Sequence, residues 1–172
     1  MLEDIVRQTA IKFCRESKIW EEQLNDIYPV LGLNRYQADL PEETEVISLA
    51  SAIQGKSDID AGIEHWPSIN VFGLLYFEEV PLPDSGPITI RTILRPSDTS
   101  TGLPDRIGLD YDTALIHGAI ADLQVMPNKD WSAPNLVAFH QNIYRTRRSE
   151  ACVCRATGNT EQPLRVTPQP FI

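Results

Sequence analysis

The hydrophobic positions of this 172-residue chain follow two different periods. Apolar side chains recur at i, i+3 and i+4 near the N-terminus and again after residue 104, whereas residues 18–97 alternate apolar and polar positions in short runs. The first period is that of one face of an α-helix, and the second is that of a half-buried β-strand. Since a helix precedes the strands and further helices follow them, the pattern predicts an α+β fold.

The helical period predicts three helices. The first covers residues 2–17, the second opens at Asp110 and Asp112, and the third begins after Ser132, the expected N-cap. The stripe of the first helix consists of Leu2, Ile5, Val6, Thr9, Ala10, Phe13 and Cys14. The stripe of the second consists of Leu115, Ile116, Ala119, Ile120, Leu123 and Met126. We therefore expect the following side chains to be buried between helices: Phe13, Leu115, Ile116, Ala119, Leu123 and Ile143.

The second and third helices form a predicted hairpin with a short corner, "MPNKDWSAP". Pro127 ends the second helix, and Pro134 lies in the first turn of the third, where a missing N–H costs nothing. We expect the prolines to stiffen the corner and Trp131 to pin it against the helices. Gly118 and Ala121 would let another helix approach closely.

Residues 18–97 are predicted to form short strands and turns. The turn signal "LGLN" predicts a hairpin between residues 18–30 and the segment "RYQADLP", with Tyr36, Ala38 and Leu40 on one face. A strand is expected before Gly55, and one or two strands are expected around Gly73. In the final strand, the residues expected to face one way are Ile88, Ile90, Thr92 and Leu94.

The chain ends in a proline-rich segment that has no helical period. Pro163, Pro168 and Pro170 favour an extended arm over residues 158–172. The arm is more apolar than a linker requires, and its apolar side chains look suited to a partner's groove. These candidate contact residues are Leu164, Val166, Phe171 and Ile172.

Charge and composition limit the class of protein. Hydrophobic residues make up 42% of the chain, which is typical of a globular domain, and no apolar run approaches the length of a membrane span. The first 86 residues carry 16 acids against 6 bases and the last 86 carry 8 against 9, for a net charge of −9. This acidic surface argues against nucleic-acid binding through phosphates. The N-terminus lacks signal-peptide character, so we expect synthesis in a cytoplasm.

The order of these parts resembles that of head-to-tail adaptor proteins of tailed bacteriophages. The resemblance rests on the segments "TAIKFCRESKIW", "RYQADLP", "IRTILRPS" and "ALIHGAIADLQVMPNKDWSAPNLVAFHQNIYR", and it covers the chain up to about residue 156. It implies a helical bundle formed by residues 1–17 and 105–157, an inserted β-rich lobe at 18–104 and an extended C-terminal arm at 158–172.

The resemblance also implies a structural function in the virion neck. Such adaptors form a ring, here expected to be a dodecamer, between the portal protein and a downstream tail or neck protein. DNA passes through the channel without sequence-specific binding, and no membrane is involved. Arg145, Arg147 and Arg148 then have two interpretations: favourable charges near a helix C-terminus, or a patch for the portal or the next subunit.

The sequence contains few motifs that indicate catalysis or the binding of a metal or phosphate. The chain has no phosphate-binding loop, no nucleophile elbow and no zinc-protease motif, and "SDIDAG" departs from a calcium loop after its glycine. His65, His117 and His140 are scattered, and Cys152 and Cys154 are too close in sequence for a zinc pair. We expect no enzyme activity, metal or cofactor. The alternative function is a monomeric β-rich module that binds a glycan or peptide, with Trp20, Trp66, Tyr76 and Phe77 as its aromatic surface.

Overall fold

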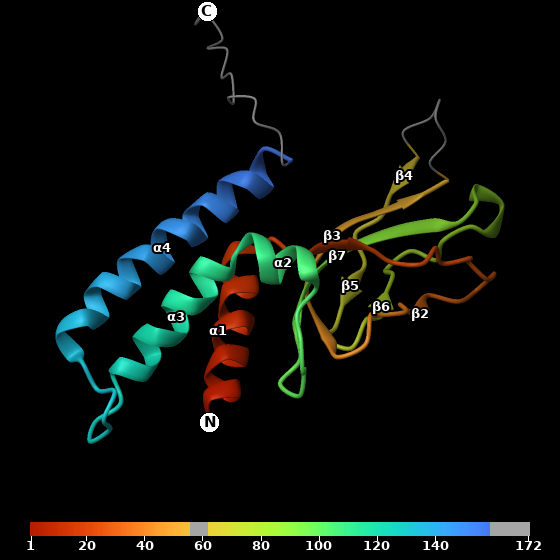
Figure 1. Cartoon of the computed structure of the whole chain (residues 1–172). Helices are drawn as coiled ribbons and strands as arrows, with labels where there is room; N and C mark the ends of the chain where they lie inside the picture. Colours follow the sequence, from red (N-terminus) through yellow and green to blue (C-terminus); the bar gives the residue numbers. More distant parts are fainter. Residues whose placement is uncertain (56–61, 159–172) are drawn as a thin grey trace, which may run out of the picture.

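The computed structural model describes residues 1–55 and 62–158 and has a mixed α+β architecture, which confirms the fold class (Figure 1). The described chain begins with helix α1 (Leu2–Ser17) and ends with α2 (Asp105–Asp110), α3 (Asp112–Gln124) and α4 (Pro134–Ala156). The strands between them are β1 (Glu21–Gln23), β2 (Arg35–Gln37), β3 (Thr44–Gln54), β4 (Ile63–Glu64), β5 (Ser68–Ile69), β6 (Leu74–Tyr76) and β7 (Ile88–Pro96).

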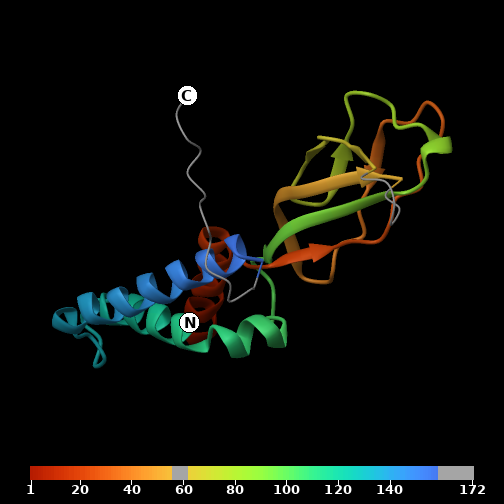
Figure 2. The ribbon, with the colours of Figure 1, turned by 90° about the horizontal axis from the view of Figure 1, so that it is seen from above.

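The helices gather at one end of the molecule and the strands at the other (Figure 2). α3 lies along α4, and α1 packs against both of them and against β7. Gly118 lies at the tightest point of this packing, because a Cβ there would come 2.6 Å from Thr9 Cγ2 of α1 and 2.9 Å from the Tyr144 ring of α4. The expectation that Gly118 permits close helix approach is therefore confirmed.

The strands form two antiparallel sheets. The larger has the order β1-β7-β3-β4, and the smaller has the order β2-β6-β5. One core cluster joins helices to the larger sheet, with Phe13, Trp20 and Leu94 among its buried side chains. A second cluster, which includes Leu75 and Ile88, lies between the two sheets. The helices and the strands consequently share one continuous region of burial at Trp20 and Leu94.

Most strand predictions are confirmed, but the predicted hairpin around "LGLN" does not form. Tyr36 and Ala38 are buried, and β7 buries Ile88, Ile90, Thr92 and Leu94 together. However, β1 pairs with β7 and β2 pairs with β6, so the segments on either side of "LGLN" do not pair with each other. The turn itself forms at residues 31–32. β1 and β2 each pair with a strand distant in sequence, because β1 belongs to the larger sheet and β2 to the smaller one.

Several residues of the predicted apolar stripes are exposed instead of buried. Leu2 and Val6 are 59% and 43% exposed, since the first turns of α1 extend beyond the packed region, and Ile116 is 53% exposed. Asp110 ends the short helix α2, which the sequence pattern did not reveal, rather than opening α3.

The corner between α3 and α4 also differs from expectation. α3 ends at Gln124, before Pro127, and the N-cap of α4 is Ala133 instead of Ser132. Trp131 is 43% exposed, with the Lys129 ammonium 5.8 Å from its ring centre, so it does not pin the corner. A backbone hydrogen bond from Ala133 N to Gln124 O joins the ends of the two helices.

Several sequence predictions fall on residues outside the described ranges. These are the turn residue Lys56, most of the "SDIDAG" segment and the arm residues Leu164, Val166, Phe171 and Ile172. Within residues 1–55 and 62–158, no helix is both long and apolar enough to cross a bilayer.

Candidate functional site

Two of the three predicted arginines, Arg145 and Arg148, line a polar groove where α1, α3 and α4 meet. The groove has a volume of about 210 Å³. Arg145 and Arg148 enter it from α4, and Lys12 and Glu16 enter it from α1. Its other lining residues are Thr9, Gly118, Ala121, Asp122, Gln141 and Tyr144. Because Gly118 and Ala121 have little or no side chain, the long polar side chains of the neighbouring helices can occupy this space.

Glu16 is the centre of the polar contacts in the groove. Arg148 Nη1 donates to Glu16 Oε2 at 2.8 Å, and the Tyr144 hydroxyl donates to the same oxygen at 3.2 Å. The Lys12 ammonium lies 5.4 Å from the centre of the Tyr144 ring. Burial, followed by the neighbouring Glu16 carboxylate, raises the pKa of Tyr144, and the hydrogen bond to Glu16 raises the pKa of Arg148. Tyr144 therefore stays protonated and Arg148 stays charged at neutral pH.

The three arginines have different environments. Arg148 pairs with Glu16 of the same chain, and Arg147 pairs with Glu150 one turn along α4 at 2.8 Å. Arg145 lines the groove, and its guanidinium has no hydrogen bond or ion pair within the described part of the chain. α4 continues to Ala156, and the basic residue in its last turn is Arg155. Residues 145–148 are therefore too far from the C-terminus of the helix to stabilise its dipole, and that interpretation of the arginines is wrong. Their contact with another subunit stays a prediction.

The structure joins two histidines that looked scattered in the sequence. His117 Nδ1 of α3 lies 2.6 Å from His140 Nδ1 of α4, and the Phe139 ring packs against both imidazoles. Burial, with His140 nearby, lowers the pKa of His117. The pair is 23 residues apart in the chain, so only the packing of α3 on α4 could have revealed it. His65 lies elsewhere and contacts Gln54 Oε1 at 2.9 Å.

The cysteines offer no reactive thiolate in the groove. Burial raises the pKa of Cys14 to about 12, so this thiol stays protonated. Cys152 and Cys154 are half-buried on α4. No cluster of three or more metal-binding side chains occurs among the residues that the structure describes. The groove therefore provides an ion pair and a hydrogen bond that join α1 to α4, with Arg145 available for a further anionic contact.

The α3–α4 hairpin exposes large apolar side chains on both helices and at the corner between them. Between residues 116 and 139 the described chain exposes Ile116 (53%), Val125 (58%), Trp131 (43%), Leu136 (45%) and Phe139 (58%). We call these five residues the hairpin apolar set. Single exposed apolar residues are ordinary, whereas apolar side chains that join into one exposed patch are typical of protein contact surfaces.

The expected aromatic surface of the β-rich region is only partly exposed. Trp66 is 73% and Tyr76 is 41% exposed, whereas Trp20 and Phe77 are buried in the two core clusters. The Arg35 guanidinium lies 5.7 Å from the Tyr76 ring, opposite it on β2. Two of the four aromatic residues are thus core residues and two remain available to a ligand.

No protein-family model matches the chain, and no curated protein matches it.

Proposed function

We propose that this protein is a non-enzymatic structural subunit of a tailed-phage virion. In this proposal, copies of the chain form a head-to-tail adaptor ring beneath the portal protein and continue the DNA channel towards a tail or neck protein. α1, α3 and α4 provide the helical bundle of the ring, residues 18–104 provide the inserted lobe, and residues 158–172 dock as an extended arm.

The observation that carries the proposal is the exposure of α4. This helix has 23 residues, which corresponds to a length of about 35 Å, yet along that described length only Tyr144 and Ala151 are buried. A long helix is seldom stabilised by so little burial within its own subunit, because helical stability comes mainly from packing of one face. The hairpin apolar set extends this open surface onto the corner and α3. A ring contact between subunits would cover such a surface.

Charge is consistent with the proposed channel. The chain carries a net charge of −9, and a ring of such subunits would repel the DNA backbone rather than hold it. DNA could then move past the subunits without sequence-specific binding. Arg145, Arg147 and Arg148 would face the portal or an adjacent subunit, with Arg145 the residue most available for that contact.

The first experiment measures assembly with the portal protein encoded in the same genome. The two proteins are expressed together, and the mass of the purified complex is determined by light scattering and native mass spectrometry. We expect one portal ring with twelve copies of this chain. Phe139→Glu should reduce attachment at least tenfold with only a small change in melting temperature, because Phe139 is 58% exposed and its ring packs within the subunit on the imidazoles of His117 and His140. The matched control, Leu31→Glu, changes an 81% exposed residue of the β-rich region and should attach normally.

A chain that remains monomeric and unattached at micromolar concentrations of assembled portal would refute the adaptor function. Equal attachment by the Phe139→Glu and unchanged proteins would leave that function standing but exclude the hairpin as the contact. Truncation after Thr157 tests the arm separately: the shortened chain should fold but fail to attach.

A second candidate function rests on exposed aromatic residues in the smaller sheet and in the loops that flank β5. Trp66, Tyr76 and Phe72 are 73%, 41% and 71% exposed, and such rings can stack on sugars or on peptide side chains. In that case the protein would act as a monomer. Binding to a glycan array that is lost in Trp66→Ala, together with a monomeric mass in the presence of portal, would favour this function over the adaptor.

A further inference from the structure

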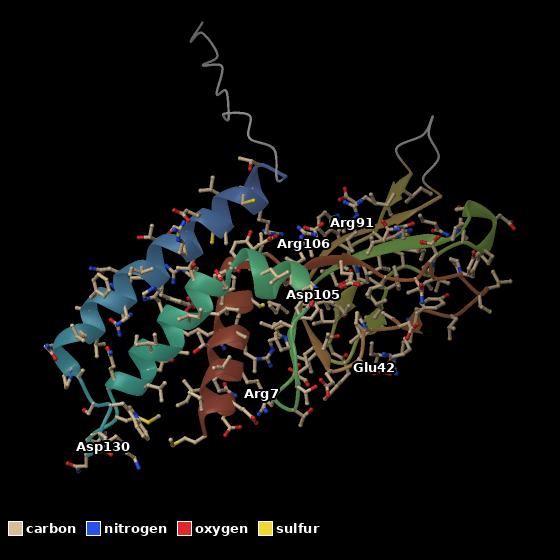
Figure 3. The ribbon with its side chains drawn as sticks, viewed as in Figure 1. Arg7, Glu42, Arg91, Asp105, Arg106 and Asp130 are labelled. Atoms are coloured by element: carbon tan, nitrogen blue, oxygen red, sulfur yellow. The ribbon has the colours of Figure 1, made fainter. Side chains whose placement is uncertain are left out.

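Three arginines converge where the helices meet the larger sheet. Arg91 comes from β7, Arg106 from α2 and Arg155 from the last turn of α4. They line a hollow of about 360 Å³, together with Ile19, Glu21, Gln23 and Gly158. Figure 3 shows Arg91 and Arg106 in the same region, beside the junction of α2 and the sheet. We call this feature the arginine hollow.

The arginine hollow has an excess of positive charge. Glu21 is its single acidic lining residue among those the structure describes, and three guanidinium groups surround it. The resulting local charge is about +2, in a chain whose net charge is −9. Asp105 precedes Arg106 in the sequence but does not line the hollow. Bringing three like charges together is unfavourable unless an opposite charge occupies the space between them.

Glu21 does not satisfy the surrounding donors. Its carboxylate oxygens lie 4.0 Å from Arg91 Nη1 and 3.8 Å from Arg155 Nη2, which exceeds hydrogen-bond distance. Arg155 Nε is buried and has no hydrogen-bond partner among the described residues. Arg106 has no ion pair within the described part of the chain. Arg91 and Arg155 are therefore only loosely ion-paired with Glu21, and guanidinium donors from three elements around one space lack a hydrogen bond to this carboxylate.

We propose that the arginine hollow binds a phosphate group, either as inorganic phosphate or as part of a small phosphate monoester. A phosphate monoester carries a charge of roughly −1.5 to −2 at pH 7, which matches the local excess better than a single carboxylate does. Guanidinium groups bind phosphate oxygens through paired N–H donors. The volume lies at the lower end of the range for small-molecule sites, so it can hold more than the bare ion.

Phosphate in this position would connect the helices to the sheet. Its ligands come from β7 of the sheet and from the helices α2 and α4. A ligand that binds only the folded state raises the free energy of unfolding by an amount that grows with the logarithm of the ligand concentration above the dissociation constant, so the melting temperature rises with it. The hollow would thus act as an anion-dependent stabiliser of the junction, and this inference is independent of the adaptor function.

The experiment measures thermal stability and binding heat with the full chain. Inorganic phosphate and glycerol 3-phosphate are compared with glycerol and with sodium chloride at equal ionic strength. At ten times the dissociation constant, we expect a rise in melting temperature of about 3–6 °C with one or both phosphate compounds. The stronger of the two identifies the source of the phosphate group. Chloride and glycerol should produce no comparable rise.

Two substitutions should act in opposite directions. Arg106→Gln should weaken phosphate binding at least tenfold, because it removes a guanidinium without breaking an ion pair of the described residues. Glu21→Gln should strengthen binding, because it removes the competing carboxylate, and this variant keeps the test decisive if Arg106→Gln fails to fold. Arg15→Gln makes the same charge change as Arg106→Gln on an exposed residue of α1 and should bind normally.

Three results would overturn the proposal. These are an equal rise in melting temperature with chloride, unchanged phosphate affinity in Arg106→Gln, and weaker binding in Glu21→Gln. Tighter binding of an oligonucleotide without terminal phosphate than of either phosphate compound would also overturn it, since the site would then recognise a nucleic-acid backbone.

Discussion

Replacement of Gly118 by alanine tests the packing of the three helices directly. The added Cβ would lie 2.6 Å from Thr9 Cγ2 and 2.9 and 3.2 Å from two carbons of the Tyr144 ring. Thr9 and Tyr144 are both buried, and the Tyr144 hydroxyl is held by Glu16, so neither side chain can move away freely. The clash should therefore cost about 2–3 kcal/mol, the upper half of the usual range for overpacking.

The intrinsic preference for alanine in a helix offsets part of this cost. Alanine is favoured over glycine by about 1 kcal/mol at a helix interior. The net loss in the free energy of unfolding should be about 1–2 kcal/mol, or about 2–8 °C in melting temperature for a chain of this size. Gly108→Ala in α2 is the matched control, because no atom lies within 4 Å of its added Cβ. That variant should be as stable as the unchanged protein or slightly more stable.

The assay is urea unfolding followed by circular dichroism at 222 nm, the usual helix signal, for both variants and for Gly118→Ala combined with Thr9→Ala. The double variant removes the closest clashing atom, so its loss should be smaller than the sum of the two single losses. Gly118→Ala stability equal to that of the unchanged protein would refute the reasoning. Strict additivity with Thr9→Ala would show that these two positions do not touch.

Further expectations concern the charges and thiols of the helices. A double-mutant cycle with Glu16→Gln and Arg148→Gln should give a coupling of about 0.5–1 kcal/mol in urea unfolding, because the pair is partly exposed, and additivity would exclude a direct interaction. The pKa of His117 is lowered by burial and by His140, so the unfolded chain binds more protons below about pH 6.5. The free energy of unfolding should fall as the pH drops from 7 to 5, and His117→Asn should flatten this dependence. Cys14, with a pKa of about 12, should resist alkylation at pH 8 longer than Cys152, as measured by peptide mass spectrometry. Faster labelling of Cys14 would show that α1 opens readily.

The sequence determined which segments are helices and which are strands over most of the chain. Its signals were local: the i, i+3 and i+4 stripe of α1, the alternation of β7, and Pro134 at the start of α4. The sequence also indicated that Gly118 permits close approach of another helix, because a glycine inside a helix usually has a packing or functional reason. Such signals depend on neighbours within a few residues, so no tertiary information is needed to interpret them.

Only the tertiary structure decided the partners of these segments. β1 and β2 could have paired with each other, but β1 adds to β7 and β2 adds to β6, because burial of two sheets against each other favours those pairs. The sequence also did not predict that Ile116 is exposed. A stripe of apolar residues shows which face of a helix is apolar, but it does not show how much of that face a neighbouring element covers.

The charged and titratable sites belong to the tertiary structure as well. Glu16 and Arg148 are 132 residues apart in the chain, and His117 and His140 are 23 residues apart. The arginines of the arginine hollow come from three elements with no common motif. Electrostatic interactions depend on distance in space, and local sequence patterns do not specify that distance. The sequence therefore determined the elements, and the packing of helices on sheet decided which charges meet.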